Sequence, residues 1–341
     1  MIKKLNCPNS EHDIQKHWKF SDKIYISCVC IAYNHESYIS DAIDSILAQE
    51  SDYRFELIIH DDNSNDSTKN ILLDYKSRFP NIIKLILQKE NQYSTGKKII
   101  PLTLPFIEGS YIAFCEGDDF WTTNNKIHIQ YTNLIQNPEI NICFSASKKS
   151  FDTMRTESYA KHSNVQAIYS LSNVIRGGGE FMPTASIMVK KSCIDTLPNW
   201  YYIAPVGDYF LQIYASTPNG ALYLPEETCN YRASSIGSWT AQRSYINIEK
   251  INNEASLYRS IFLELSQHEL YRPDAMFALS KQLFLLSIIL IKNKKYTLAK
   301  EMIINSRMYY KNINTKQMIC YYMRNIFPLF RILLKIHNRN N

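Results

Sequence analysis

The N-terminal part of the chain alternates short apolar runs with amphipathic patterns, and this alternation restricts the fold more than any other feature. Apolar runs rich in β-branched residues predict buried strands at 23–32, 55–60 and 82–88. Between them, 36–49 and 68–79 carry apolar residues at helical spacing. The order strand, helix, strand, helix, strand predicts an α/β fold, a doubly wound, mostly parallel sheet flanked by helices.

Polar clusters stand where three of the predicted strands end. Tyr33-Asn34 and Asp61-Asp62 follow the first two strands, and Asp118-Asp119 follows the later apolar run 111–115. Such sheets bind ligands at the carboxyl ends of their strands, so we expect the clusters to share one crevice. Adjacent carboxylates at the end of a buried strand are costly unless a partner compensates them. A hard cation carried by a diphosphate is such a partner, which points to an enzyme that handles a nucleotide.

The chain's 341 residues are enough for one large α/β domain and a smaller module. We expect an N-terminal arm at 1–22, the α/β domain at 23–241 and a basic helical module at 242–341. Long helical patterns in this last part occupy 246–269, 272–292 and 295–310.

Positive charge is concentrated at the C-terminal end. Residues 281–341 hold twelve Lys and Arg and one acid, a balance of +11, whereas the rest of the chain carries −5. One interpretation is a helical cap with a solvated lysine face. The other is a surface for anionic membrane headgroups, since aromatic and basic side chains on a helix suit them. The segment carries no recognised nucleic-acid motif, so nucleic acid is not an expected partner.

The sequence also bears on the compartment. The longest apolar candidate, 283–291, is shorter than the roughly 18–20 residues that span a bilayer, and no apolar segment of a secretory signal follows the basic N-terminus. The eight cysteines are dispersed without metal-finger spacing, so we expect reduced, mostly buried thiols. These features predict a cytoplasmic protein, and the basic module leaves peripheral attachment to the inner face of the plasma membrane open.

Two ordered motifs and a third strand end carry a family resemblance. Val29–Asn34 (VCIAYN), then Ile58–Thr68 (IIHDDNSNDST), then the aspartates of Tyr111–Asp119 follow the order found in family 2 glycosyltransferases. Over about 24–240 the chain resembles the nucleotide-sugar half of those enzymes, which have a GT-A fold. The resemblance implies a GT-A domain at 23–241.

The resemblance assigns the donor site to the first two strand ends. It implies that Asp62 accepts a hydrogen bond from the uracil of a UDP-sugar, and that Tyr33 stacks on or lines the base beside Ala32 and Asn34. Structural alternatives remain, because Asp61-Asp62 also suits a helix-entry turn and Tyr33 could pack on the first helix.

The resemblance assigns the metal to the third strand end. Asp119 would ligate Mn²⁺ or Mg²⁺ together with the diphosphate, and Asp118 would contact the ribose or sugar. The Asp-x-Asp of many members is replaced here by Gly117-Asp118-Asp119. That departure leaves open which aspartate binds the metal directly. A structural turn is the alternative for both.

Four further residues are expected to take part in the transfer. Asp208 matches the position of the family's catalytic base, which removes the proton of the acceptor hydroxyl, although an Asp there also suits a helix cap. Arg232 is expected to reach the diphosphate or support a closing loop, or else to be a surface arginine. Thr184 and Trp239 are the acceptor candidates. The cluster Gly177–Gly179 is either a mobile loop or a loop over the acceptor site.

Together these features predict an inverting, non-processive hexosyl- or N-acetylhexosaminyltransferase. It would move one sugar from a UDP-sugar to a growing surface glycan, such as lipopolysaccharide or capsule, on a glycan or lipid-linked acceptor. The Gln-x-x-Arg-Trp motif of processive members is not found. A nucleotidyltransferase is a rival, but 32–36 lacks its Gly-rich phosphate loop. A catalytically inactive glycan- or membrane-binding relative is the other.

Overall fold

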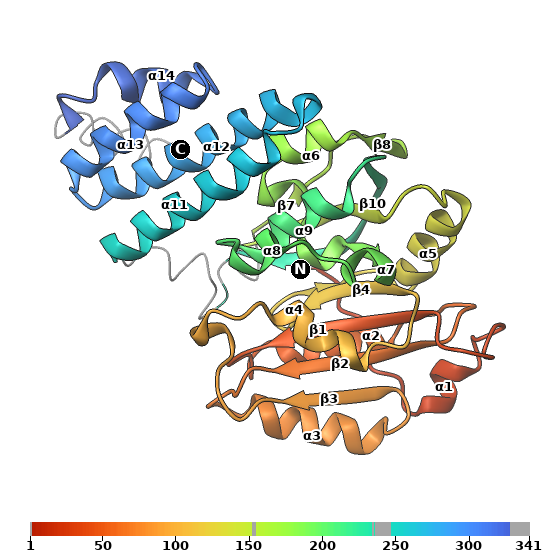
Figure 1. The fold of residues 1–341 in the computed structure, drawn as a ribbon. Coiled ribbons are helices and arrows are strands. Elements are labelled where there is room, and N and C mark those ends of the chain that lie inside the picture. The colour runs from red at the N-terminus through yellow and green to blue at the C-terminus, as the bar shows by residue number, and fades with distance from the viewer. Residues whose placement is uncertain (1, 152–154, 234, 236–246, 328–341) are drawn as a thin grey trace. The chain divides into compact units, whose positions relative to one another are not determined.

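The computed structural model describes residues 2–151, 155–233, 235 and 247–327. The chain forms two compact units, Met1–Tyr202 with Gly207–Ala241 and Ile203–Val206 with Gln242–Asn341. The first unit is mixed α/β and the second is helical (Figure 1). The predicted α/β class, with a mostly parallel sheet and a C-terminal helical region, is confirmed.

The strands of the first unit belong to one sheet. Their bounds are β1 Ile26–Ala32, β2 Phe55–Asp61, β3 Ile83–Leu87, β4 Tyr111–Glu116, β5 Phe120–Trp121, β6 Ile142–Ser150, β7 Thr156–Tyr159, β8 Ala167–Tyr169, β9 Met188–Lys190 and β10 Ala221–Arg232. The order is β3-β2-β1-β4-β9-β6-β10-β5, with β7 paired to β6 and β8 to β10. β1 pairs in parallel with β2 and β4, and β2 with β3. These four strands therefore end at one edge, as predicted (Figure 1).

The later strands make the sheet mixed. β9 runs antiparallel to both β4 and β6, whereas β10 runs parallel to β6. β10 also pairs with β5, which lies directly after the Gly117–Asp119 turn. A strand from the C-terminal half of the unit thereby reaches the predicted metal site.

Helices of the first unit connect and cover these strands. Their bounds are α1 Glu11–Gln15, α2 Ile39–Leu47, α3 Thr68–Arg78, α4 Ile99–Thr103, α5 Lys126–Gln136, α6 Leu171–Gly177, α7 Lys191–Ile194, α8 Asn199–Ile203 and α9 Gly207–Ala215. α2 and α3 occupy the two helical patterns predicted between the first three strands.

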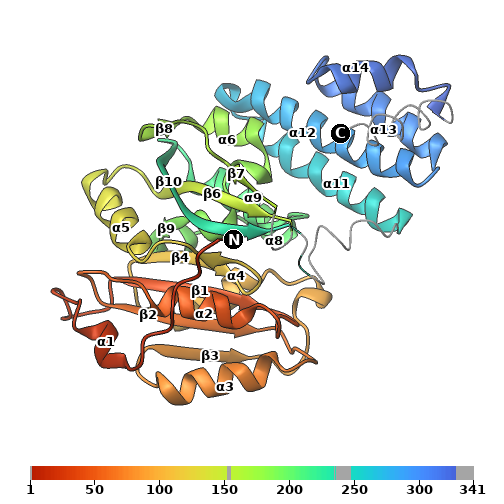
Figure 2. The same ribbon diagram turned by 180° about the vertical axis from the view of Figure 1, so that it is seen from behind.

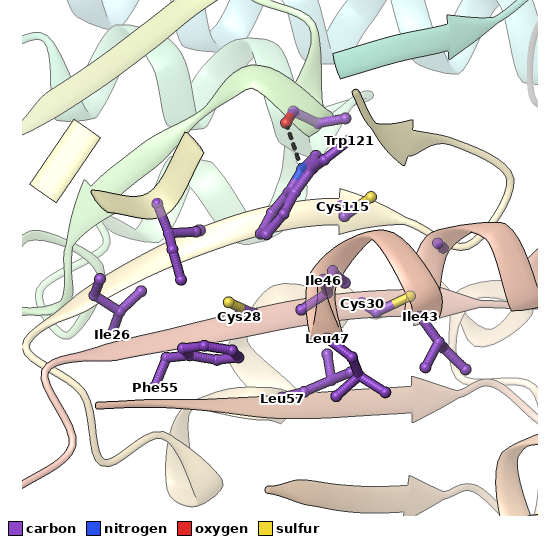
Figure 3. Packing of buried hydrophobic residues seen from close by; sticks show 14 of the residues in the cluster. Ile26, Cys28, Cys30, Ile43, Ile46, Leu47, Phe55, Leu57, Cys115 and Trp121 are labelled. Carbon is purple, nitrogen blue, oxygen red and sulfur yellow. Dashed lines mark hydrogen bonds between the residues drawn. The ribbon is translucent and has the colours of Figure 1, made fainter. Parts of the chain in front are cut away.

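The core lies between α2 and the parallel strands (Figure 3). Ile43, Ile46 and Leu47 of α2 are fully buried over the cysteines of β1. Trp121 is also fully buried, and its indole N–H donates to the carbonyl oxygen of Ala185 at 3.0 Å. All eight cysteines are free thiols and six are buried. Their packing agrees with the expected reduced state.

The N-terminal segment predicted as an arm packs onto the first unit. Ile14 of α1 is 1% exposed, and the Trp18 ring meets the Phe55 ring edge-on at 5.9 Å between centroids. The Glu11 carboxylate accepts two hydrogen bonds from Asn81. The segment is too short to show a period, so its one buried isoleucine was not recognisable from sequence.

The helical module contains four described α-helices (Figure 2), at α11 Ile248–Leu265, α12 Arg272–Lys292, α13 Tyr296–Tyr309 and α14 Thr315–Tyr322. α12 and α13 form a helical hairpin that turns at Asn293-Lys294, with Lys294 at φ 63°. Buried hydrogen bonds link Ser280, Ser306 and Gln317 across the module.

One sequence expectation about this module was wrong. Glu269–Lys292 spans 24 residues, and an 18-residue window within it has a mean hydropathy of 1.7, so by length and composition it is sufficient to cross a membrane. Scattered polar residues such as Ser280 and Gln282 conceal this when only unbroken apolar runs are counted. In the part of the chain that the structure describes, 67% of its apolar window is buried. That burial is typical of the core helix of a helical bundle.

Candidate active site

The loops after β1 and β2 are tied together by side chains. Asn34 has a left-handed φ of 55°, which Asn tolerates better than most residues. Its backbone N–H donates to the Ser64 hydroxyl at 2.8 Å, and its side-chain oxygen accepts from the Asn65 N–H at 2.8 Å. Asn34, predicted beside the base, therefore fixes the relative position of the two loops.

Two aspartates of the Asp61–Asp66 motif are also structural. Asp61 accepts hydrogen bonds from the backbone N–H and the hydroxyl of Ser64. Asp66 accepts from the Thr68 N–H at 3.0 Å at the start of α3. The aspartate therefore caps this helix, while the Ser67 side chain makes no capping bond. The hydrogen bonds of Asp61 within this turn agree with the helix-entry alternative for that residue. Among the described residues, Asp62 makes no such bond and contacts Gln92 and Tyr93 instead.

Asp62 is 2% exposed and anchors a different segment. One carboxylate oxygen accepts from the Gln92 N–H at 2.8 Å, and the other accepts from the Tyr93 N–H at 3.0 Å. Each carboxylate oxygen has two acceptor positions, so one remains on each. The Asp62 N–H donates to the Ala32 carbonyl at 3.0 Å, which places Tyr33 next to it. The Tyr33 side chain is 38% exposed and available to a planar ligand.

Gly117 allows the Asp118-Asp119 turn to approach the loop after β1. A Cβ at this position would lie 2.7 Å from His35 Nδ1, 3.0 Å from Ile39 Cδ1 and 3.2 Å from Ala32 Cβ. Contacts this short require a neighbour to shift. The glycine therefore sets how closely the Asp118-Asp119 turn approaches Ala32 and His35.

Gly117→Ala is expected to lower the free energy of unfolding by about 1–3 kcal/mol, the usual cost of overpacking, and to weaken nucleotide binding. Gly207→Ala is the matched control, because its Cβ would lie 3.4 Å from the Tyr201 hydroxyl oxygen, an ordinary contact. Chemical denaturation of both variants tests this. Equal stability of the two variants would contradict the proposed close approach.

Asp119 is a buried carboxylate with one unused oxygen. The residue is 1% exposed, and its Oδ1 accepts from the Arg232 N–H at 2.8 Å. Its Oδ2 is buried and has no hydrogen-bond partner among the described residues. Burial, and the charges of Asp118 and Glu116, raise its pKa well above the usual value. A buried oxygen of this kind requires an explanation, and a bound ion is one.

Asp118 and Arg232 hold the turn in place. Asp118 Oδ2 accepts from the Ser235 hydroxyl at 2.5 Å, and its carbonyl oxygen accepts from the Arg232 guanidinium at 2.6 Å. Arg232 also pairs with Asp41 of α2 and lies over the Phe120 ring, 4.5 Å from the centroid. The guanidinium expected to reach the diphosphate is thus committed to positioning the aspartate turn.

Glu116 is a fourth carboxyl group of the site. Burial, followed by the charges of Asp118 and Asp208, raises its pKa to about 8, against a weaker opposing effect of a hydrogen bond with the Thr184 side chain. Thr184, predicted to line the acceptor pocket, therefore lies within the carboxylate cluster. Glu116 ends β4, and its position beside Asp118-Asp119 was the only sequence signal for its role.

Asp208 lies in the first turn of α9, where its Oδ1 accepts from the Tyr209 N–H at 2.7 Å. Burial raises its pKa, and the positive charge of Lys98 partly offsets this. Lys98 approaches the same turn, 3.9 Å from where a Gly207 Cβ would be. No motif marked Lys98 in the sequence. One Asp208 oxygen therefore accepts a hydrogen bond at the start of α9. The negative charge of Asp208 also raises the pKa of Glu116.

The structure brings together Asp118, Asp119, Thr184, Asp208 and Arg232, and it places Ala32, Tyr33, Asn34 and Asp62 along the same edge of the sheet. Trp239, the second acceptor candidate, lies outside the described residues.

The chemistry of the cluster fits a hard divalent ion such as Mn²⁺ or Mg²⁺. Among the described residues no group of three or more His, Cys, Asp and Glu side chains has the arrangement of a complete metal site. The unpartnered Asp119 Oδ2 offers one anionic oxygen. Ions of this type commonly take one or two protein carboxylates and complete their shell with phosphate and water.

Comparisons with known proteins point to one family. Residues 27–194 match the model of "Glycosyl transferase family 2". An uncharacterized protein of Mycobacterium tuberculosis is 29% identical over 217 residues, 63% of this chain and 60% of that protein. The chain thus spans about 60% of the length of such curated relatives. A "UDP-Glc:alpha-D-GlcNAc-diphosphoundecaprenol beta-1,3-glucosyltransferase" of Escherichia coli is 33% identical over 34% of this chain and 43% of its own.

Solved structures show the same fold. TarS of S. aureus, crystallised with UDP-GlcNAc, superposes with a TM-score of 0.57 at 15% identity, over 88% of this chain and 92% of that one. A mannosyltransferase of Pyrobaculum calidifontis in complex with GDP-Man and Mn²⁺ gives 0.50 at 14% identity, over 89% and 90%. At such identities the likeness supports the GT-A fold alone.

Proposed function

Because the chain belongs to glycosyl transferase family 2 through residues 27–194, we propose that it transfers one sugar from a UDP-sugar, with inversion, to a growing cell-envelope glycan. The observation that carries this proposal is the convergence of Asp62, Asp119 and Asp208, with Glu116 and Asp118, at one edge of the sheet. One relative is named for glucosyl transfer to GlcNAc-diphosphoundecaprenol and another, putatively, for teichuronic acid biosynthesis, which supports an acceptor of this kind.

The donor base is proposed to bind between Asp62 and Tyr33. Uracil carries an imide N–H that can donate a hydrogen bond to a carboxylate, and cytosine lacks this N–H. Asp62 retains one acceptor position on each oxygen, and Tyr33 offers an exposed ring beside it. The buried anchor to Gln92 and Tyr93 fixes the carboxylate before the nucleotide arrives, which reduces the cost of ordering it.

Asp119 is proposed to hold Mn²⁺ or Mg²⁺ through Oδ2, and Asp118 to contact the ribose or the sugar. When bound, the ion neutralises the charge that grows on the departing diphosphate. Arg232 keeps Asp119 Oδ1 occupied through its backbone N–H and so leaves Oδ2 free to bind. The site is therefore largely preformed.

Asp208 is proposed to act as the general base. As the acceptor oxygen attacks the anomeric carbon, the bond from that carbon to the diphosphate breaks and Asp208 takes the hydroxyl proton. Attack opposite the leaving group inverts the anomeric centre. Burial raises the pKa of Asp208, which makes it a better proton acceptor while the charge of Lys98 favours its ionised form.

A nucleotide panel tests the donor assignment. Thermal shift with UDP-, GDP-, CDP- and dTDP-sugars, with Mn²⁺ or with a chelator, is expected to show stabilisation by UDP-sugars that requires the metal. A ligand at 100 times its Kd adds about 2.7 kcal/mol of stability, which is a clear shift. Stabilisation by another nucleotide alone, or equal stabilisation in chelator, would contradict the proposal.

The helical module is proposed to attach the enzyme to the inner face of the plasma membrane. Met308 and Tyr322 are 76% and 67% exposed, and Ile319 and Ile326 are also exposed. Lys316 is exposed on the same short helix as Tyr322. Exposed apolar and basic residues together suit anionic headgroups. A lipid-linked acceptor like that named for the E. coli relative would require this location.

Met308→Ser with Tyr322→Ser is expected to weaken binding to vesicles of 30% anionic lipid by about tenfold, because each change removes an exposed apolar side chain. The control pair, Leu73→Ser with Ile135→Ser, changes exposed apolar residues of the other unit. Co-sedimentation measures both. If both pairs bind as the unaltered protein does, the module is a solvated cap.

A further inference from the structure

A broad hollow lies beside the carboxylate cluster, and its lining residues have no assigned part in the proposed reaction. Its volume is about 660 Å³, and it is lined by Ser158–Asn164 and Glu180. This volume lies within the range of ligand pockets, which is roughly 300–1,000 Å³. The lining comes from the end of β7, the loop after it and the segment that follows Gly177–Gly179. None of the donor-site residues contributes to it.

The hollow adjoins Asp208. A Cβ on Gly179 would lie 4.0 Å from Asp208 Oδ2, and the next residue, Glu180, lines the hollow. Gln212 of α9 donates to the Met182 carbonyl oxygen at 2.9 Å and so fixes this segment to the helix that carries Asp208. One wall of the hollow is therefore held against Asp208, the proposed general base.

Tyr159 is a lining residue of the hollow whose ring is held in place by its neighbours. Its ring stacks on Tyr231, 5.7 Å between centroids, and Lys149 Nζ lies 4.8 Å from its centroid. Burial, then the charges of Glu180, Asp208 and Asp119, raise its pKa, so its hydroxyl stays protonated and can donate. The ring is held from two directions, by Tyr231 and by Lys149.

The walls are ordered although several lining side chains are exposed. The His162 ring stacks on Phe181 at 4.2 Å between centroids, and its Nε2 donates to the Phe181 carbonyl oxygen at 2.9 Å. His162 thereby joins the loop after β7 to the segment that contains Glu180. The hollow is thus a built feature of the first unit.

The charges around the hollow favour an acceptor that carries a phosphate. Lys161 lines the hollow and is exposed, and Lys149 Nζ lies against the ring of the lining residue Tyr159. Glu180 follows Gly179, which approaches Asp208, and Glu180 and the Tyr159 hydroxyl suit the hydroxyl groups of a sugar. Lysine is a common partner of phosphate. The two kinds of group match a sugar with an anionic attachment.

We propose that this hollow is the acceptor subsite, and that it binds a pyranose carried on a phosphate or diphosphate. The pyranose lies against Tyr159 and Glu180, with one hydroxyl toward Asp208, and the phosphate lies against Lys161. The inference rests on the proposed function, because it assigns the second substrate of that same reaction.

The test uses the full chain with Mn²⁺ and UDP bound. Titration calorimetry with decyl diphosphates of α-GlcNAc, α-glucose and α-galactose is expected to show binding of at least one of them. Lys161→Glu is expected to weaken that binding at least tenfold, and Tyr159→Phe several-fold, with the affinity for UDP unchanged. Lys69→Glu, an exposed lysine of α3, is the control and is expected to bind like the unaltered protein.

Separate titrations distinguish recognition of the sugar from recognition of the anion. GlcNAc and inorganic diphosphate, titrated separately, report whether the sugar, the anion or both are recognised. Binding of none of the three acceptors with UDP bound, binding of inorganic diphosphate alone, or equal acceptor binding in Lys161→Glu and Tyr159→Phe would overturn this inference alone. Failure of UDP to bind the unaltered protein with Mn²⁺ would overturn the proposed function, and this inference with it.

Discussion

Asp119→Asn is expected to remove metal-dependent UDP binding while leaving the fold intact. The asparagine oxygen can still accept the Arg232 N–H, as Oδ1 does now, but the uncharged amide replaces the unpartnered Oδ2. Loss of a group that only supports a metal ligand already costs 10–100-fold in metal affinity. We therefore expect at least about a 100-fold loss of UDP affinity with Mn²⁺ and little change in chelator.

The control for this variant is Asp74→Asn, an exposed carboxylate of α3 in an i,i+4 pair with Arg78. Titration calorimetry with UDP, with and without Mn²⁺, compares the two variants. Because burial disfavours the ionised form of Asp119, its replacement should not lower the thermal stability of the metal-free protein. Unchanged metal-dependent affinity would show that Asp119 is not the ligand and would favour Asp118.

The same binding depends on pH in a direction that the carboxyl pKa values fix. Burial and neighbouring charge raise the pKa of Glu116 to about 8, and that of Asp119 is also raised. Metal binding requires ionised ligands, so protons leave as the ion binds. UDP affinity with Mn²⁺ should rise from pH 6 to pH 8, about tenfold per unit for each proton released.

Without metal, the free energy of unfolding should fall as pH rises from about 4.5, where Glu116 ionises in the unfolded chain, toward 8, where it ionises in the folded protein.

Asp208→Asn is expected to abolish transfer and spare donor binding. An asparagine can keep the hydrogen bond from the Tyr209 N–H but cannot accept the proton of the acceptor hydroxyl. General base catalysis contributes about 10²–10⁴-fold, so the rate of UDP release in the presence of acceptor should fall by that factor. The affinity of this variant for UDP with Mn²⁺ should stay within about twofold of the unaltered protein's. The reason is that Asp208, the proposed general base, is not expected to contact the nucleotide.

Asp195→Asn is the matched control, since Asp195 is 42% exposed and pairs with Lys191 on the surface. It is expected to release UDP at the unaltered rate. Transfer by Asp208→Asn at a rate close to that of the control would place the base elsewhere, and Glu116 would then be the next candidate. Loss of UDP binding in Asp208→Asn would instead indicate a structural role for the α9 terminus.

The parallel half of the fold was predictable because its signals are local. β1 to β3 alternate with α2 and α3 in the order that apolar periodicity indicates, and the bounds of α12 match the predicted 272–292. Asp62 and Asp118-Asp119 follow directly from strand ends, since parallel neighbours bring those ends together.

The rest of the site depends on pairings between distant residues. Arg232 reaches Asp118 and Asp119 because β10 pairs with β5 after more than a hundred intervening residues. Its ion pair with Asp41 has the same origin. Lys98 enters the cluster by approaching the first turn of α9, and no spacing rule connects it to Asp208. Local patterns therefore found the groups proposed to act, while tertiary pairing supplies those that position them.

A crystal of the full chain soaked with UDP and Mn²⁺, measured at a wavelength where manganese scatters anomalously, would show whether Asp119 holds the metal and Asp62 the uracil. We expect an anomalous peak about 2.0–2.6 Å from Asp119 Oδ2, the range that hard divalent ions show with oxygen ligands, with the uracil N–H within hydrogen-bond distance of the Asp62 carboxylate and the Tyr33 ring against the uracil. A peak that lacks Asp119 as a ligand, or a uracil bound away from Asp62, would contradict this assignment.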